Sequence, residues 1–524
     1  MADVVEMAKV SMRGGFNVFW GIAVSTVISA VGVIFLARLL SPSEYGLVAV
    51  VWVAPGLVQN FRDWGMNSAM IKFAAQYRSE GKGANLKNVV LAGWLFELAM
   101  GLGLSIVLYL LSGYVAANVF NRADLEPLIQ LASFMVFTGA LLTTAQSIFT
   151  GYERMELYSI TLLLRSTLKA VLAPLIVVFG FGVLGVIVGS MLGLLIAGVV
   201  SVVIMYLSIR RSLQNSTGEK PRIIEDLKRM LKYGLPISFS TILLGFRTQF
   251  FNFLMAINIA EHLIGNYQVA LNFAVLISFF SMPIATVLFP ALSKINANEE
   301  TETLRTVFQF SVKISAFLVV PAAATVIALS APAVSTLFGE QYVHAPLYLA
   351  LIAITYLYSA IGNLSVGNLI NSQGETRVTL KLSLISTAIG IPLSLMLIPK
   401  FGVIGLIAAN IITGTPAPLI GLWWIRKHFK VSIDYISSIK ILMAATLAAA
   451  ITYITIALLT LPYWIELFIG TGAFLVIYLI TAPSIRAINK TDLHNLREMA
   501  RALGPLFYLF NPLLVLMEKL TLET

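Results

Sequence analysis

The chain has 524 residues, of which 58% are hydrophobic and 11% charged, and its mean hydropathy is +0.88. Soluble domains carry about 25% charged residues, so this composition excludes a soluble globular protein and indicates an integral membrane protein. The formal net charge of +10 does not point to nucleic acid, because cytoplasmic loops of membrane proteins collect Lys and Arg. The absence of cysteine excludes disulfides and thiol chemistry.

Apolar stretches of about 20 residues recur along the chain, and each is long enough to cross a bilayer as an α-helix. They lack the alternating polar positions of a transmembrane β-barrel. We therefore predict an all-α polytopic membrane protein with about fourteen transmembrane helices. We expect the first helix to be retained rather than cleaved as a signal peptide. The expected limits are 14–38, 45–70, 87–112, 126–150, 157–179, 182–208, 234–258, 264–292, 304–330, 346–371, 379–399, 402–425, 437–460 and 463–482.

The distribution of basic residues gives the orientation. If the N-terminus is placed in the cytoplasm, only three of the 35 Lys and Arg fall in outer segments, namely Arg38, Arg122 and Lys400. Five lie inside spans and the rest fall in inner segments, as the positive-inside rule requires. We predict a multi-pass protein of a prokaryotic plasma (inner) membrane with both termini in the cytoplasm.

An internal repeat divides the chain. Phe181-Gly-Val-Leu-Gly matches Phe401-Gly-Val-Ile-Gly at an offset of 220, and Ala37 and Gly46 match Ala256 and Gly265 at 219. Near-equal offsets indicate two six-helix copies in parallel orientation, related by a pseudo-twofold axis along the membrane normal. Such halves enclose a cavity and rock about it. The predicted domains are an N-terminal lobe (1–208), a basic cytoplasmic linker (209–233), a C-terminal lobe (234–425), two additional helices (426–482) and an amphipathic cytoplasmic tail (483–524).

The linker region, residues 209–234, holds seven Lys and Arg against three acids. Ile223, Leu227, Met230 and Leu231 fall on one helical face within it, which predicts a short helix lying on the inner leaflet.

Several signals of soluble enzymes fail in this sequence. Gly180-Phe-Gly-Val-Leu-Gly fits the dinucleotide fingerprint GxGxxG but joins two spans instead of a strand and a helix. The four His are isolated and predict no metal cluster. We predict no cofactor and no catalytic residues.

Charged residues inside predicted spans are the candidates for function, since each costs several kcal/mol in the bilayer centre. The candidate substrate-binding residues are Arg62, Arg165, Lys169, Arg247 and Lys313, and the candidate ion-coupling residues or charge partners are Asp63 and Glu97. Positive charge is in excess, so a cavity lined by these residues should favour an anion. Arg suits bidentate contact with phosphate.

Alternatives stay open for individual residues. Arg62 and Lys313 either face the cavity or snorkel to the cytoplasmic surface. Glu97 is either a coupling residue or a structural partner for one of the bases. Arg165 and Lys169 are four residues apart and therefore share one helix face.

Two segments, Leu36-Ala-Arg-Leu-Leu-Ser-Pro-Ser-Glu-Tyr-Gly-Leu-Val-Ala-Val and Asp63-Trp-Gly-Met-Asn-Ser-Ala-Met-Ile-Lys, resemble the opening of the polysaccharide transporter family. This family contains Wzx-like oligosaccharide flippases of the multidrug/oligosaccharidyl-lipid/polysaccharide exporter superfamily. The Phe401 turn and the loop Gln373-Gly-Glu-Thr-Arg are also similar to it. The family has no universal catalytic motif, so the candidate residues above come from this chain's own charges.

The resemblance implies two six-helix lobes, alternating access and a polyprenyl-diphosphate-linked oligosaccharide as cargo. The expected function is a flippase that moves this cargo to the outer leaflet for assembly of cell-surface polysaccharide such as lipopolysaccharide. The expected partners are the lipid-linked oligosaccharide and the bilayer, with a glycan polymerase or glycosyltransferases as further candidates, and no nucleic acid. The alternatives are a multidrug/cation antiporter of the same superfamily and a membrane-embedded polymerase or glycosyltransferase.

Overall fold

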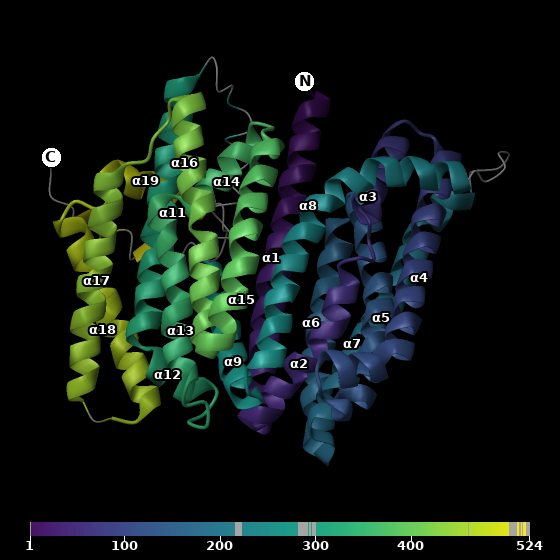
Figure 1. Ribbon diagram of the computed structural model, residues 1–524. Helices are drawn as coiled ribbons and strands as arrows, with labels where there is room; N and C mark the ends of the chain where they lie inside the picture. Colours follow the sequence, from purple (N-terminus) through teal and green to yellow (C-terminus); the bar gives the residue numbers. More distant parts are fainter. Residues whose placement is uncertain are drawn as a thin grey trace. The chain divides into compact units, whose positions relative to one another are not determined.

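The computed structural model describes residues 2–214, 223–280, 292, 295, 300–459, 461–501, 511–512, 515 and 517–519 (Figure 1). These residues form helices and contain no strand. Part of the linker, including Lys220 and Arg222, lies outside the described residues, as do part of the expected span 264–292 and part of the tail.

Among the described residues, the first half of the chain contains eight α-helices and three short 3-10 or π segments. They are α1 (Ala2–Leu39), α2 (Pro42–Gln59), α3 (Met66–Ser79), α4 (Gly83–Tyr114), η1 (Val115–Val119), η2 (Ala123–Leu125), α5 (Glu126–Gly151), α6 (Met155–Ile176), η3 (Val177–Phe181), α7 (Gly182–Gln214) and α8 (Ile223–Asn258).

The second half continues in the same way. Its elements are α9 (Glu261–Ser278), α11 (Thr301–Ala328), α12 (Ser330–Leu337), α13 (Ala345–Ala353), η4 (Ile354–Ile361), α14 (Asn363–Ser372), α15 (Thr376–Gly414), α16 (Pro416–Phe429), α17 (Tyr435–Leu458), α18 (Tyr463–Ser484) and α19 (Lys490–Arg501).

The chain folds into two compact units. The first contains residues 1–265 and 394–402, and the second contains residues 266–393 and 403–524. The domain limits inferred from the internal repeat stay a prediction.

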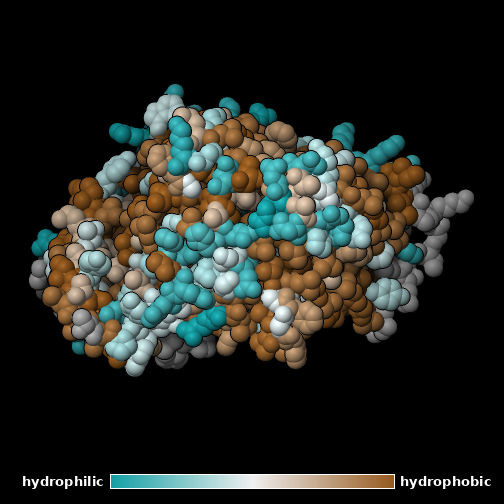
Figure 2. All heavy atoms as spheres, turned by 60° about the horizontal axis from the view of Figure 1, so that its bottom comes forward, coloured by the Kyte–Doolittle hydropathy of each residue, from teal (hydrophilic) through white to brown (hydrophobic). Residues whose placement is uncertain are grey.

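Eight helical stretches in the described residues are long and apolar enough to cross a membrane, and a bent pair, Ala345–Ile361 with Asn363–Ser372, would make nine. Two of the stretches, Met155–Ile209 and Thr376–Phe429, contain 55 and 54 residues. At 1.5 Å per residue such a length is about 80 Å, more than twice the hydrocarbon thickness, so each contains more than one crossing. Apolar side chains also cover large areas of the surface in Figure 2. The protein is therefore a multi-pass membrane protein, and the total of fourteen helices stays a prediction.

The repeated Phe-Gly turns have the same backbone conformation in both copies. Gly182 has φ 45° and ψ −128°, and Gly402 has φ 58° and ψ −132°. This region of backbone space is open essentially to glycine alone. The motif that revealed the repeat is thus a sharp turn that only glycine can make, placed 220 residues apart.

The second matched pair of the repeat meets in space. A Cβ on Gly46 would lie 1.9 Å from the carbonyl oxygen of Glu261, and a Cβ on Gly265 would lie 1.9 Å from the carbonyl oxygen of Pro42. Since 42 and 261 differ by the same 219 residues as 46 and 265, the contact is locally twofold. The starts of α2 and α9 touch backbone to backbone here, and both glycines are needed for that approach.

Small residues also bring the helices of the first unit together. A Cβ on Gly21 or Gly32 of α1 would collide with Ser159 or Ala170 of α6, respectively. The order of these contacts shows that α1 and α6 run parallel, as the predicted orientation of their spans requires. Lipid tails are as apolar as leucine, so membrane helices associate by such close packing rather than by hydrophobic burial.

The expected single helix over 45–70 is wrong. The helix is broken at residues 60–65 between α2 and α3, because Trp64 has φ 47° and Gly65 has φ 78°. Both values lie in the left-handed region, which ends a helix. A Cβ on Gly65 would lie 2.2 Å from the carbonyl oxygen of Gly234, so the turn packs directly on α8.

The motif that opens α2 has a simple physical role. The Ser41 hydroxyl accepts a hydrogen bond from the backbone N–H of Glu44, and the Glu44 carboxylate accepts one from the backbone N–H of Ser41. Pro42 occupies the first helical position, where its missing N–H costs nothing. Ser-Pro-Ser-Glu is therefore a capping box that fixes the start of α2.

Candidate functional site

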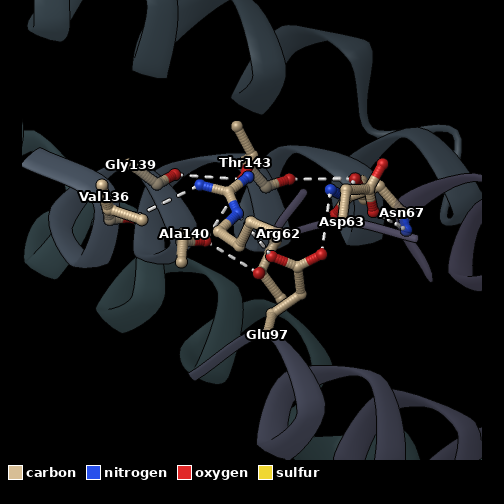
Figure 3. Close-up of polar contacts among 10 residues, drawn as sticks. Arg62, Asp63, Asn67, Glu97, Val136, Gly139, Ala140 and Thr143 are labelled. Carbon is tan, nitrogen blue, oxygen red and sulfur yellow. Dashed lines mark hydrogen bonds and ion pairs between the residues drawn. The ribbon is translucent and has the colours of Figure 1, made fainter. Parts of the chain in front are cut away.

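Arg62 lies in the break between α2 and α3 and points into the first unit. Its Nε lies 3.0 Å from Glu97 Oε2, and the two side chains are 4% and 0% exposed (Figure 3). Arg62 Nη2 donates to the Thr143 hydroxyl at 2.8 Å, and Nη1 donates to the Val136 carbonyl at 3.4 Å. Arg62 therefore does not snorkel. Its guanidinium joins the helix break to α4 and α5.

A polar network surrounds this ion pair. Asn67 Nδ2 donates to Glu97 Oε1 at 3.3 Å, and the Ser147 hydroxyl donates to Asn67 Oδ1 at 2.8 Å. Asp63 Oδ1 accepts a hydrogen bond from the Asn67 backbone N–H at 2.8 Å, which caps the first turn of α3. The structure thus brings Arg62, Asp63 and Glu97 together around Asn67, with Glu97 as the partner of Arg62.

Lys313 also has a carboxylate partner. Its Nζ lies 2.5 Å from Asp492 Oδ2 of α19, and each side chain is 12% exposed. Leu493, the next residue of α19, is buried in the same cluster as Ile441 and Met517. Both alternatives that the sequence left open for Lys313 omitted this partner. Helix α19 of the tail therefore packs on α11 within the second unit, and its Asp492 neutralises Lys313.

Arg165 and Lys169 lie on one face of α6. Lys169 Nζ lies 4.8 Å from the ring centroid of Trp52 on α2, within the range of a cation–π interaction. Arg165 is exposed. Among the described residues neither side chain has a carboxylate within 4.0 Å, so this face presents two uncompensated positive charges.

Arg247 lies on α8, which packs on α2 through glycines. A Cβ on Gly56 would lie 2.8 Å from Gln249 Nε2, and a Cβ on Gly245 would lie 2.5 Å from Asn60 Oδ1. Arg247 falls between these two contacts in the sequence and is partly exposed. Within the described ranges it forms no ion pair. Since Trp52 and Gly56 are one turn apart on α2, helices with uncompensated cations contact α2 at neighbouring positions.

The five candidate bases therefore fall into two classes. Arg62 and Lys313 are paired with carboxylates. Arg165, Lys169 and Arg247 have no such partner in the part of the chain that the structure describes, and all three belong to the first unit.

Sequence reasoning missed the neutral and distant partners. Asn67, Thr143 and Ser147 gave no signal because single polar residues are common in membrane helices. Trp52 was not recognised as a ring for Lys169. Asp492 is far from Lys313 in the sequence, and the amphipathic pattern of the tail predicted only a helix on the inner leaflet, without this partner.

Comparisons with known proteins identify relatives of this chain. A lipopolysaccharide biosynthesis protein, WzxC of Escherichia coli strain K12, is 24% identical over 385 residues, which are 71% of this chain and 73% of that protein. The probable lipid II flippase MurJ of Rhizobium meliloti is 26% identical over 289 residues, 52% of each chain.

Solved structures support the fold. The lipid II flippase MurJ in an inward closed conformation superposes with a TM-score of 0.69 at 17% identity, covering 89% of this chain and 98% of that one. An inward-facing multidrug resistance transporter of the MATE family and the MOP superfamily superposes with a TM-score of 0.65 at 17% identity. The superposition covers 78% of this chain and 94% of that one. The all-α transporter fold expected from the sequence is confirmed.

The profile of one protein family, described as "Polysaccharide biosynthesis protein", matches residues 35–347. This match covers more than half of the chain and includes the capping box of α2, the network around Arg62 and all three uncompensated cations. The chain belongs to the polysaccharide biosynthesis protein family.

Proposed function

We propose that this protein is a flippase that moves a polyprenyl-diphosphate-linked oligosaccharide from the cytoplasmic to the outer leaflet by alternating access. The family and the flippases among its relatives support the class of function. The observation that carries the proposal is the set of three uncompensated cations in the first unit, Arg165, Lys169 and Arg247. The product would serve assembly of cell-surface polysaccharide such as lipopolysaccharide.

An anionic diphosphate is the cargo group that this charge distribution fits. Each unpaired cation in a membrane protein costs several kcal/mol, and a bound anion offsets that cost. Arg165 and Arg247 can each donate two parallel hydrogen bonds to phosphate oxygens, while Lys169 supplies a point charge. The prenyl tail would remain in lipid.

Arg62 and Glu97 have a different proposed role. Their mutual pairing leaves Arg62 little capacity for cargo, so we assign the pair to holding the break between α2 and α3 in place. We keep Asp63 and Glu97 as candidates for ion coupling, through exchange of a proton at this network. The membrane potential is a further source of work, since moving one negative charge outward across 100 mV of inside-negative potential releases about 2.3 kcal/mol.

The expected orientation puts both termini in the cytoplasm of a prokaryotic cell and the linker at the inner face. Glycan polymerases or glycosyltransferases would act before or after the flippase. Transport itself requires no covalent change in the cargo, so we propose that the protein is not an enzyme.

A multidrug exporter with cationic cargo is the main alternative. It would need a carboxylate available to the cargo in the membrane. Glu97 is fully buried against Arg62, and Asp63 accepts the backbone N–H of Asn67. This engagement favours an anionic cargo.

Reconstituted proteoliposomes provide the test. Purified protein is inserted into vesicles that carry a lipid-linked oligosaccharide labelled in the sugar, and accessibility of the sugar to an external glycosidase is followed over time. Removing charged hydrogen bonds should weaken cargo binding by roughly 10- to 100-fold for each group. We therefore expect Arg247→Ala, and the double variant of Arg165→Ala with Lys169→Ala, to abolish translocation at limiting cargo.

Arg154→Ala is the matched control, because Arg154 is an exposed base of the same unit that lies 3.6 Å from Glu156. It should translocate normally. Full activity of the Arg247→Ala protein and of the double variant would disprove the assignment of the cargo site. A covalently altered glycan in the vesicles would instead support a polymerase or transferase.

A further inference from the structure

Helices α3 and α8 of the first unit contact each other (their ribbons are labelled in Figure 1). A group of cations and aromatic rings lies at this contact. The rings of Phe73 and Tyr77 of α3 stack with 6.2 Å between their centroids. The ring of Tyr233 of α8 contacts Phe73 edge-on, with 5.7 Å between the centroids. We call these three rings the aromatic triad. Phe73 and Tyr77 are 5% and 3% exposed, so the triad is anchored in the core of the first unit.

Two exposed cations rest on the aromatic triad. Lys72 Nζ lies 3.8 Å from the Tyr233 ring centroid and 5.5 Å from that of Phe73. The Arg229 guanidinium lies 5.1 Å from the Phe73 centroid, and its Nη1 donates to the Tyr77 hydroxyl at 2.5 Å. Cation–π contacts orient both groups without neutralising them.

Acidic residues nearby leave these charges available. Among the described residues neither Lys72 nor Arg229 has a carboxylate within 4.0 Å. Glu80 is an acidic residue that interacts electrostatically with Arg229. Its hydrogen bond from Lys82 is the main cause of its lowered pKa, and the Arg229 charge makes a smaller contribution. The Glu80 carboxylate lies 2.6 Å from Lys82 Nζ and so is already paired.

The exposed residues at the start of α8 indicate where Lys72 and Arg229 lie relative to the membrane. Met230 is fully buried beside the aromatic triad, which fixes the first turns of α8 on the unit. The opposite face of these turns exposes Lys228 and Lys232, with Ile224 70% exposed on the same line. Just beyond, the exposed residues become apolar, with Leu235, Ile237 and Phe239 between 41% and 58% exposed. Such a change from Lys to apolar residues is the mark of a membrane interface, where lipid phosphates lie.

We propose that Lys72 and Arg229, held on the aromatic triad, bind the phosphate of an anionic phospholipid headgroup of the class of phosphatidylglycerol or cardiolipin. The two donors come from α3 and α8, so a bound lipid would tie α8, the helix that follows the linker, to α3. Lys228 and Lys232 add attraction to the same leaflet. This site is separate from the cations assigned to the cargo, and it does not depend on which cargo is moved.

Full-length protein reconstituted in nanodiscs of phosphatidylcholine, with and without phosphatidylglycerol, tests the site. Retained lipid is counted by native mass spectrometry after release from the disc. The parent should retain phosphatidylglycerol in preference to phosphatidylcholine. Removing two interfacial bases should weaken that preference by about 30-fold in the double variant of Lys72→Ala with Arg229→Ala.

The matched control for Lys72→Gln removes one other exposed base of the unit, by Arg154→Gln. Arg154 is ion-paired with Glu156, so the control loses the same charge and should keep the lipid preference within about twofold. Arg229→Lys keeps the charge and should retain most of the binding. Lys72→Gln changes only an exposed side chain, so it provides the test if the double variant does not fold, with an expected loss of about fivefold.

Three results would overturn the proposal. The first is equal retention of both lipids by the parent. The second is the same loss in the Arg154→Gln control as in Lys72→Gln, which would show only diffuse attraction. The third is displacement of phosphatidylglycerol by farnesyl diphosphate but not by cardiolipin, which would assign the site to the cargo lipid.

Discussion

Removal of one member of the Arg62–Glu97 pair should destabilise the protein strongly. Both side chains are almost completely buried, at 4% and 0% exposure. In Glu97→Gln the Arg62 guanidinium keeps only neutral acceptors, Thr143 and the Val136 carbonyl. An uncompensated buried charge of this kind costs about 3–5 kcal/mol. Glu97→Gln should therefore lower the free energy of unfolding by about that amount.

Replacing both members should restore much of the loss. A buried ion pair exchanged for apolar residues of similar volume is often neutral, because the desolvation penalty of both charges disappears. The double variant of Arg62→Met with Glu97→Met should then be more stable than either single variant. The free energy of unfolding would be measured by titration with SDS in mixed micelles. Parent-like stability of Glu97→Gln, or a double variant weaker than both singles, would refute this reasoning.

The same variants separate a structural from a coupling role. A double variant that regains stability and transport would assign the pair to structure alone. A stable double variant that no longer transports would show that the pair has a role in transport beyond stability.

Three further predictions concern other contacts. Asp492→Asn leaves Lys313 without its carboxylate at 12% exposure, so thermal inactivation should accelerate, and Lys313→Met in the same protein should reverse most of the effect. Gly265→Ala places a Cβ 1.9 Å from a backbone oxygen, so the expressed protein should lose its monodisperse peak in size-exclusion chromatography. Gly81 also has a positive φ, but a Cβ there would meet open space, so the control Gly81→Ala should keep the peak. Ser41→Ala removes the side-chain cap of α2 and should cost about 1 kcal/mol in the same SDS titration, with Ser41→Asp retaining the parent value.

The repeat and the helix class were predictable because they depend on local chemistry. The turns at Gly182 and Gly402 require glycine because of their backbone conformation. The two copies therefore have similar sequences at this turn, and the repeat can be detected there. Ser41 and Glu44 lie within one helical turn, and a capping box can be read directly from such spacing.

The break between α2 and α3 was not predictable in the same way. Residues 59–63, Gln-Asn-Phe-Arg-Asp, interrupt the apolar stretch 45–70. A polar run of this length fits inside one helix as well as between two, and the Trp-Gly step at 64–65 adds no strong signal. The turn is fixed by contact with Gly234, which lies far along the chain. Tertiary packing decided against the local pattern.

Partners of charged residues were the other gap. The sequence identified the charges, because each is expensive in a membrane. It could not say that Glu97 would meet Arg62 or that Asp492 would meet Lys313, since neither pair has helical spacing. Ion pairs in the folded chain neutralise Arg62 and Lys313. The excess positive charge inferred from the sequence therefore lies on the other three candidate bases.

The internal repeat offers an argument about why the uncompensated cations are present. With the offset of 220, the positions that correspond to Arg165 and Lys169 in the other copy are Ile385 and Ile389, and with the offset of 219 the position that corresponds to Arg247 is Ile28. Ile385 and Ile389 are each 38% exposed, so an apolar residue suits that helix face when only folding is required. A cation at the same place costs several kcal/mol in the membrane and gains no carboxylate partner in the described chain. These three charges therefore fit the anionic cargo proposed above, which would supply the compensation that the described chain does not.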